Sequence, residues 1–174
     1  MVTLWIGTDQ GCADRRTPVN LVANGRRPGA ATGIVHDERH HVSLKTHAGE
    51  RLGLKPGAVV QELGWDDDVD DTVRQQIEDT IDADLVDGDY GDVVDAVLLW
   101  WRDGDGDLVD ALVDSLTDLV GGGVIWLLTP KIGRSGAVEA ADIAEAAPIA
   151  GLATTNTVSL EEWSATKLVS PKGR

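Results

Sequence analysis

Two uninterrupted apolar runs constrain the fold of this chain more than any other feature of its sequence. Residues 96–101 read AVLLWW, and residues 124–129 read VIWLLT. Both runs have the length of a β-strand, and a strand that is apolar at every position needs cover on both of its faces. Such strands are typical of the centre of a parallel sheet that lies between two layers of helices.

A helix pattern lies between the first of these strands and an earlier one. Residues 58–63 read AVVQEL and are bounded by glycines, which predicts a buried strand. Apolar residues then recur at intervals of four, which predicts an amphipathic helix. They are Val69, Val73, Ile77 and Ile81. Asp66, Asp67 and Asp68 precede this helix and are well suited to cap it.

A second helix pattern joins the two apolar runs. Residues 108–120 carry the apolar spacing of a helix, with Asp107 as its expected N-cap and glycines 121–123 as its expected end. A short extra strand is also expected around residues 85–86. Strands therefore alternate with helices, as in a parallel sheet with right-handed crossovers.

The last part of the chain completes the expected sheet. An Ala-rich helix is predicted at residues 138–147, with Pro148 marking its end, and two β-prone runs follow at residues 154–160 and 165–170. We therefore expect an α/β fold, a Rossmann-like three-layer sandwich. Its mainly parallel sheet would have about five strands, with an antiparallel C-terminal strand.

The N-terminal segment reads differently from the rest. In residues 1–45, Gly, Pro, Arg and Asn recur without sustained periodicity, as in the NGRRPG of residues 24–29. We expect this segment to be a disordered or loosely attached arm, followed by the Rossmann-like domain in residues 46–174. A short helical turn at residues 50–54 would open that domain. One hypothesis is that the arm reflects a mis-assigned start and that translation begins later, at Val42.

Charge and cysteine content indicate which classes of partner and which cellular compartment to expect. The formal net charge is -15, and all of the excess acid follows residue 50. Such a surface repels phosphate backbones, so no nucleic-acid partner is expected. No apolar stretch has the length of a signal peptide core or a membrane span, so no membrane association is expected. The single cysteine, Cys12, cannot form an internal disulfide, which favours a cytoplasmic location.

The residue types of the folded part exclude several catalytic classes. Residues 51–174 contain no histidine and no cysteine, because His36, His40, His41 and His47 all lie in or beside the arm. Catalysis by Ser-His-Asp or Cys-His groups, and zinc sites made of cysteine and histidine, would therefore need the arm to reach back. No catalytic residue and no cofactor is predicted.

An alternating acidic loop, DGDGD at residues 103–107, invites a calcium interpretation. The sixth residue from Asp103 is Leu108 rather than glycine, and the twelfth is Asp114 rather than glutamate, so the loop departs from an EF-hand. A turn that caps the following helix explains the same acids. We therefore predict no metal site.

Ligand-binding candidates gather where the expected strands end, since open α/β sheets bind ligands at the carboxyl ends of their strands. Aromatic and charged residues at these ends could hold a planar or anionic ligand by stacking and charge pairing. The alternative is that the tryptophans are core and the cations pair with the abundant acids. The candidates are Glu62, Trp65, Trp100, Trp101, Arg102, Lys131 and Arg134, the last from a basic loop at residues 131–136 that precedes a helix.

Several segments resemble the actinobacterial family known as domain of unknown function 3052. The resemblance covers about residues 45–172 and implies a compact cytosolic protein, without supplying catalytic residues. The matching segments are LKPG at 54–57, ELGWDD at 62–67, DAVLLWWRDGDGDL at 95–108, GVIWLLTPK at 123–131 and WSAT at 163–166.

More distantly, three segments are similar to the first, fourth and fifth strands of S-adenosylmethionine-dependent methyltransferases. They are the strand that leads to an acid and Gly64, DAVLLWW at 95–101 and GGGVIWLLTP at 121–130. Those enzymes use a glycine-rich loop after the first strand, whereas Gly64 is followed here by Trp65 and three aspartates. We therefore expect a non-catalytic regulatory or protein-interaction module with a basic protein partner. The alternative is a small-molecule-binding protein or methyltransferase-like enzyme whose site lies at the carboxyl ends of the strands.

Overall fold

A computed structural model describes residues 46–171 of the chain. The predictions made for the arm at residues 1–45, including the later start, lie outside the described residues. Four helices and five strands occur in the described part. The helices are α1 (Ala48–Leu52), α2 (Asp71–Ile81), α3 (Leu108–Asp114) and α4 (Ala140–Ile149), and the strands are β1 (Val60–Leu63), β2 (Val94–Trp100), β3 (Leu119–Pro130), β4 (Ala153–Ser159) and β5 (Trp163–Val169).

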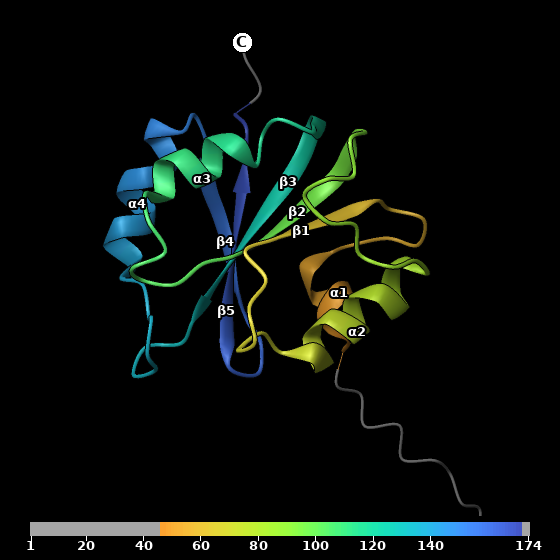
Figure 1. The fold of residues 1–174 in the computed structure, drawn as a ribbon, viewed down its shortest axis with the longest axis horizontal. Coiled ribbons are helices and arrows are strands. Elements are labelled where there is room, and N and C mark those ends of the chain that lie inside the picture. Colours follow the sequence, from red (N-terminus) through yellow and green to blue (C-terminus); the bar gives the residue numbers. More distant parts are fainter. Residues whose placement is uncertain (1–45, 172–174) are drawn as a thin grey trace, which may run out of the picture. The chain divides into compact units, whose positions relative to one another are not determined.

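The five strands form one sheet in the order β1-β2-β3-β5-β4. β1, β2 and β3 pair in parallel, whereas β5 runs antiparallel to both of its neighbours, β3 and β4. Helices α1 and α2 lie on one side of the sheet and α3 and α4 on the other (Figure 1). The expected α/β fold with three layers and a mainly parallel sheet is therefore confirmed.

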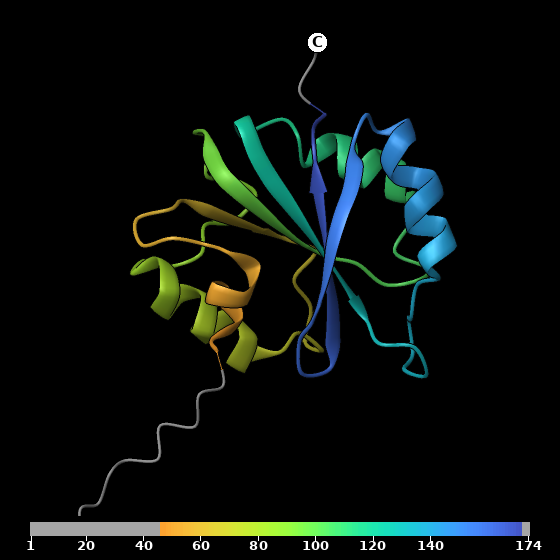
Figure 2. The same ribbon diagram turned by 180° about the vertical axis from the view of Figure 1, so that it is seen from behind.

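The apolar runs of the sequence occupy the middle of this sheet. β2 pairs with β3 from Ala96–Val124 to Trp100–Leu128, so the two runs lie side by side. Figure 2 shows the β4–β5 hairpin, which forms the edge of the sheet opposite β1. Because alternate residues point to opposite faces, each run supplies a core to both helix layers.

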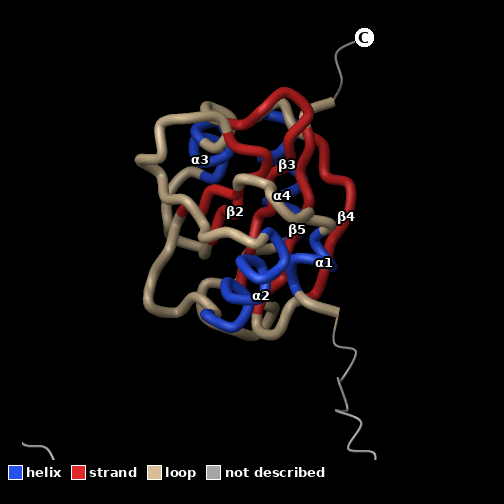
Figure 3. The backbone as a smooth tube through the Cα atoms, turned by 90° about the vertical axis from the view of Figure 1, so that its right-hand side faces the viewer, coloured by secondary structure: helices blue, strands red, loops and turns tan. Residues whose placement is uncertain are grey.

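The core is divided by the sheet into two clusters. On the side of α1 and α2, which face the viewer in Figure 3, the cluster contains Trp100, Trp126 and Trp163. On the side of α3 and α4 it is mainly aliphatic, with Leu112 and Leu127 fully buried. Each helix layer therefore covers a different kind of surface.

The first long helix begins later than its acidic prefix suggests. Asp70 is the N-cap of α2, and its side chain accepts hydrogen bonds from the backbone N–H groups of Thr72 and Val73. The prediction that Asp66, Asp67 and Asp68 cap this helix was therefore wrong. The prediction for Asp107 is confirmed, because it caps α3 by accepting from Val109 and Asp110. Both caps satisfy free N–H groups at a helix start.

The second predicted helix is shorter than its apolar spacing suggests. α3 ends at Asp114, and glycines 121–123 lie inside β3 rather than ending a helix. A Cβ atom on Gly123 would lie 2.8 Å from the carbonyl oxygen of Asp95 and 2.6 Å from a methyl carbon of Leu119. The glycine therefore permits a close approach of β3 to β2, where the pairing register shifts.

Two smaller features also differ from simple expectation. Pro148 lies within the last turn of α4 rather than beyond its end. The expected strand at residues 85–86 is reduced to a single parallel bridge between Gln61 and Val86, beside β1. None of the helices in residues 46–171 is both long and apolar enough to cross a bilayer.

Candidate functional site

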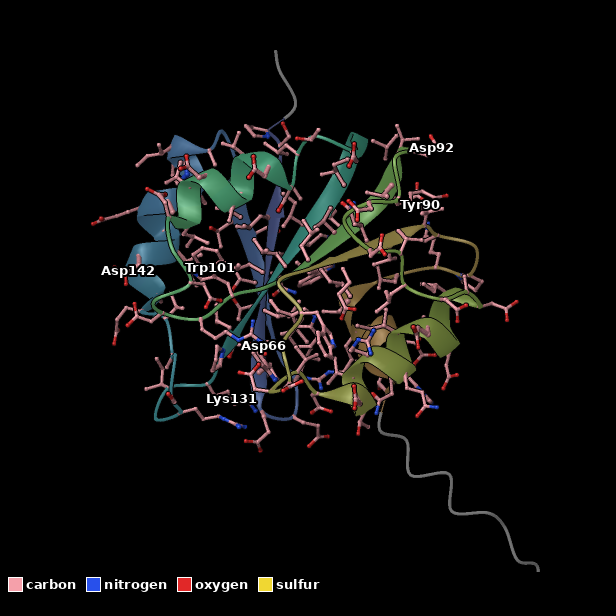
Figure 4. The ribbon with its side chains drawn as sticks, in the orientation of Figure 1. Asp66, Tyr90, Asp92, Trp101, Lys131 and Asp142 are labelled. Atoms are coloured by element: carbon pink, nitrogen blue, oxygen red, sulfur yellow. The ribbon has the colours of Figure 1, made fainter. Side chains whose placement is uncertain are left out.

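A pocket of about 480 Å³ opens where β1 and β2 end. Its position is set by the parallel pairing of these strands, which brings the residues after Leu63 and Trp100 to the same edge of the sheet. Figure 4 labels Asp66 and Trp101, which lie in this part of the fold. The pocket is lined by Leu63, Gly64, Trp65, Asp66, Leu99, Trp100, Trp101, Arg102, Asp105, Ala111 and Asp114.

The structure brings together four of the seven predicted site residues. Trp65, Trp100, Trp101 and Arg102 all line this pocket, whereas the other three candidates are not part of its lining. The indole of Trp65 is the most accessible of the four side chains, since the residue is 56% exposed. Trp65 is thus the predicted residue best placed to meet a ligand.

Glu62 instead belongs to a buried polar network. Its carboxylate accepts two hydrogen bonds from Arg74 of α2, at 2.7 and 2.8 Å, and a third at 2.9 Å from Nε1 of Trp100. The Glu62 side chain is only 8% exposed. This hydrogen-bonded pairing raises the pKa of the Arg74 guanidinium. Glu62 therefore holds α2 to the sheet, and its oxygens are engaged within the fold.

Arg102 is held by several groups at the edge of the pocket. Its guanidinium donates to both carboxylate oxygens of Asp68 and, at 2.7 Å, to the carbonyl oxygen of Gly64. It also lies over the ring of Trp163, with 5.2 Å between the guanidinium carbon and the ring centroid. The hydrogen bonds from Arg102 lower the pKa of Asp68 below its ordinary value. We call Arg102 and Asp68 the clamp.

Two glycines make room for this arrangement. Gly64 has a φ of +70°, and a Cβ atom there would lie 2.2 Å from the carbonyl oxygen of Trp100. Gly136 has a φ of +73°, and a Cβ atom there would lie 2.8 Å from Cβ of Arg102. Both positions require glycine because of backbone conformation and space. Gly64 is thus used for contact between β1 and β2 within the protein.

Lys131 and Arg134 lie beside the turn that joins β4 to β5. The Lys131 ammonium donates to the carbonyl oxygen of Glu161 at 2.7 Å, and Arg134 forms an ion pair with Glu162. Figure 4 shows the labelled Lys131 near this end of the sheet. The basic loop at residues 131–136 therefore contacts acidic residues of the same chain. Its binding of an anion stays a prediction.

Two aspartates of the acidic loop at residues 103–107 accept hydrogen bonds within the fold. Asp105 accepts a hydrogen bond from the backbone N–H of Arg102 at 2.9 Å, while Asp107 caps α3. Within residues 46–171, no group of three or more histidine, cysteine or acidic side chains has the arrangement of a metal site.

Sequence reasoning missed three residues that shape the site. Asp68 forms the clamp, Trp163 supports it from β5, and Asp114 of α3 adds a third acid to the pocket lining. Trp163 had a signal, because it opens a segment that carries the family resemblance. The sequence pattern predicts Asp68 as a helix cap, and it singles out Asp114 only as the twelfth position of a loop that departs from an EF-hand.

Comparison with known proteins identifies the family. The family model described as protein of unknown function (DUF3052) matches residues 49–172. This chain belongs to the DUF3052 family. Uncharacterised proteins of Mycobacterium tuberculosis and Mycobacterium bovis are each 53% identical to it over 146 residues, which cover 84% of this chain and 89% of theirs. The expected family, with its actinobacterial members, is confirmed.

Comparison with solved structures finds similarity at low sequence identity. The mitomycin 7-O-methyltransferase MmcR matches 72% of this DUF3052 chain with a TM-score of 0.50 and 12% identity. The pyocyanin biosynthetic protein PhzM matches 72% of it with a TM-score of 0.49 and 14% identity. The matched part spans about half of each of these structures, 53% and 54%. The likeness to MmcR supports a Rossmann-like fold.

Proposed function

We propose that this DUF3052 protein is a non-catalytic binding module that recognises a protein partner through the pocket at the ends of β1 and β2. The observation that carries the proposal is the contrast between Trp65 and the charged groups behind it. Trp65 is 56% exposed at the pocket, whereas Glu62 and Arg102 are held by other residues of the fold. The pocket thus offers an exposed indole for contact, while the charged groups of Glu62 and Arg102 are engaged within the fold.

The contacts of Glu62 and Arg102 argue against acid–base or nucleophilic work by these two residues. A general acid or base must reach the substrate proton, yet the Glu62 carboxylate already accepts three hydrogen bonds. The guanidinium of Arg102 is likewise taken up by Asp68 and the carbonyl of Gly64. Breaking these contacts would leave buried charges unpaired, which is costly.

A methyltransferase-like enzyme is the competing proposal, and its support is the shared fold and the position of the pocket. The residues do not fit S-adenosylmethionine in the way that the resemblance implies. A Cβ atom at Gly64 would meet the carbonyl oxygen of Trp100, so a contact within the protein accounts for this glycine, and Trp65 and three aspartates follow it in place of further glycines. Fold alone does not fix function. We therefore propose binding without a resident cofactor.

The partner we propose is a protein with a basic surface, in the cytoplasm. The net charge of -15 favours association with positive surfaces and disfavours nucleic acids and anionic membranes. Electrostatic attraction of this kind would speed the encounter, while the pocket would give it a defined contact.

Site-specific photo-crosslinking in actinobacterial cells tests the proposal. A photoreactive phenylalanine analogue at Trp65 is expected to give a discrete protein adduct, because the side chain would lie in the interface. The matched control is Ile149, which is 72% exposed on α4. The proposal predicts the adduct at position 65 and not at position 149. No adduct at position 65, or the same adducts at both, would contradict it.

Thermal-shift measurements separate the two candidates further. A ligand present at 100 times its dissociation constant stabilises a protein by about 2.7 kcal/mol. We expect S-adenosylmethionine to leave the melting temperature unchanged. A shift that disappears when Trp101 is replaced by alanine would support the methyltransferase-like alternative instead.

A further inference from the structure

Resting on the proposed function, we propose that the pocket receives an arginine side chain of the basic partner. The guanidinium would stack on Trp65, and the pocket carboxylates would pair with its charge. The inference comes from the charges of the lining, the exposure of one indole and the apolar residues between them.

The charge of the pocket lining favours a cation. Its acidic members are Asp66, Asp105 and Asp114, and its one basic member is Arg102. Arg102 is already paired with Asp68, which lies outside the lining, and, at 3.7 Å, with Asp105, which lies within it. Among the described residues, neither Asp66 nor Asp114 forms an ion pair. A phosphate or carboxylate ligand would meet uncompensated negative charge, whereas a cation would be attracted.

The aromatic and apolar parts of the pocket favour arginine in particular. The face of an exposed indole attracts a cation, most strongly when water is partly excluded. Leu63, Leu99 and Ala111 form apolar lining that the methylene stem of the side chain could cover. A planar guanidinium can stack on an indole while it donates to carboxylates, which an ammonium group does less well. We therefore expect arginine to bind better than lysine.

The protein already contains one example of this contact. Arg102 lies over the ring of Trp163 while it donates to the carboxylate of Asp68. The proposed guest would make the same kind of contact with Trp65 and Asp114 on the open side of the pocket. The internal pair shows that the fold tolerates a guanidinium stacked at this edge of the sheet.

The test uses acetyl-Gly-Arg-Gly-amide as the probe and the full chain as the receptor. The indole N–H signal of Trp65, assigned by its loss in Trp65→Phe, is followed by NMR during titration. We expect a saturable shift of that signal. The citrulline analogue, which has the same shape without the charge, is expected to bind about tenfold more weakly. The lysine tripeptide is expected to bind several-fold more weakly than the arginine tripeptide.

Substitutions of equal charge separate the pocket from the general field of the protein. Asp114→Asn is expected to weaken binding of the arginine tripeptide about threefold or more, because it removes a pocket carboxylate. Asp142→Asn makes the same change of charge on the exposed surface of α4 and is expected to leave the affinity unchanged. Equal weakening by both variants would contradict a specific arginine site.

The two proposals fail in different ways. If the arginine tripeptide leaves the Trp65 signal unmoved, or binds no better than its citrulline analogue, the arginine inference is wrong. Crosslinking at position 65 would then still support a protein partner of other chemistry. If the crosslink also fails, the proposed function falls with it. Where a crosslink forms, the partner peptide attached to position 65 is expected to contain arginine.

Discussion

The two faces of the sheet carry different kinds of side chain. The face under α1 and α2 carries three tryptophans and a partly buried ion pair between Glu62 and Arg74. The face under α3 and α4 is mainly aliphatic and contains one tryptophan, Trp101, at its edge. Apolar packing alone would stabilise either face. The polar groups of the first face therefore point to a second task, which is to position the residues behind the pocket.

We call the face under α1 and α2 the polar face. Contacts on it run continuously from α2 to the pocket. Glu62 joins Arg74 to Trp100, and Trp100 packs edge-to-face on Trp163 with 4.8 Å between ring centroids. Trp163 in turn lies under Arg102. Such networks couple neighbours energetically, whereas aliphatic contacts are satisfied by shape and volume. The comparison therefore makes different predictions for the two faces.

The largest expected effect concerns one core residue from each face. Trp100→Ala should cost about 3–5 kcal/mol of unfolding free energy and Leu127→Ala about 2–5 kcal/mol, since both side chains are fully buried. Combined with Arg74→Ala, the Trp100 change should be non-additive by about 0.5–3 kcal/mol, because both residues bind Glu62. The Leu127 change should be additive within about 0.5 kcal/mol. Urea unfolding measures all three.

A milder variant keeps the test possible if Trp100→Ala does not fold. Trp100→Phe keeps an aromatic ring on the polar face but removes the N–H that donates to Glu62. Its coupling with Arg74→Ala should persist. If the Trp100 and Leu127 substitutions were equally additive with Arg74→Ala, the two faces would not differ in the way described.

A smaller effect is expected for the clamp and depends on pH. Hydrogen bonds from Arg102 depress the pKa of Asp68 in the folded state, so the clamp stabilises the protein above the unfolded pKa of about 3.9. That stability is lost as pH falls through the depressed folded value. Asp68→Asn should therefore cost about 0.2–1 kcal/mol at pH 7, since Asp68 is half exposed. The difference from wild type should vanish in strong acid.

Unfolding midpoints of the two proteins between pH 2 and pH 8 would check this prediction. Asp67→Asn is a suitable control, because Asp67 is exposed and its carboxylate forms no ion pair with another described residue. A difference for Asp68→Asn that grows toward acid would contradict the direction of the pKa shift.

Much of the fold follows from the sequence because burial controls it locally. The runs at residues 96–101 and 124–129 predict central strands, since a continuous apolar strand needs cover on both sides. The structure pairs these two strands side by side. The end of α3 was missed because residues 115–120 remain apolar at helical spacing, while glycines 121–123 suggested an end. The close approach of Gly123 to Asp95 is a tertiary constraint, and no local pattern reveals it.

The candidate site was only partly predictable for the same reason. Strand ends placed Trp65 and Arg102 correctly at one edge, as parallel pairing requires. The partners of Arg102 and Glu62 come from α2, β5 and the loop between β1 and α2, and the sequence offered many acids and cations that could have paired with them. Choosing among these pairs needs three-dimensional distances.

The smallest expected effect on stability belongs to Trp65, and it tests the central claim most directly. Trp65 differs from the other pocket tryptophans because its side chain is largely exposed. Measured on one preparation of Trp65→Ala, the unfolding free energy should stay within about 0.5 kcal/mol of wild type, while binding of the crosslinked partner should fall about tenfold or more. Unchanged partner binding by this folded variant would contradict the account.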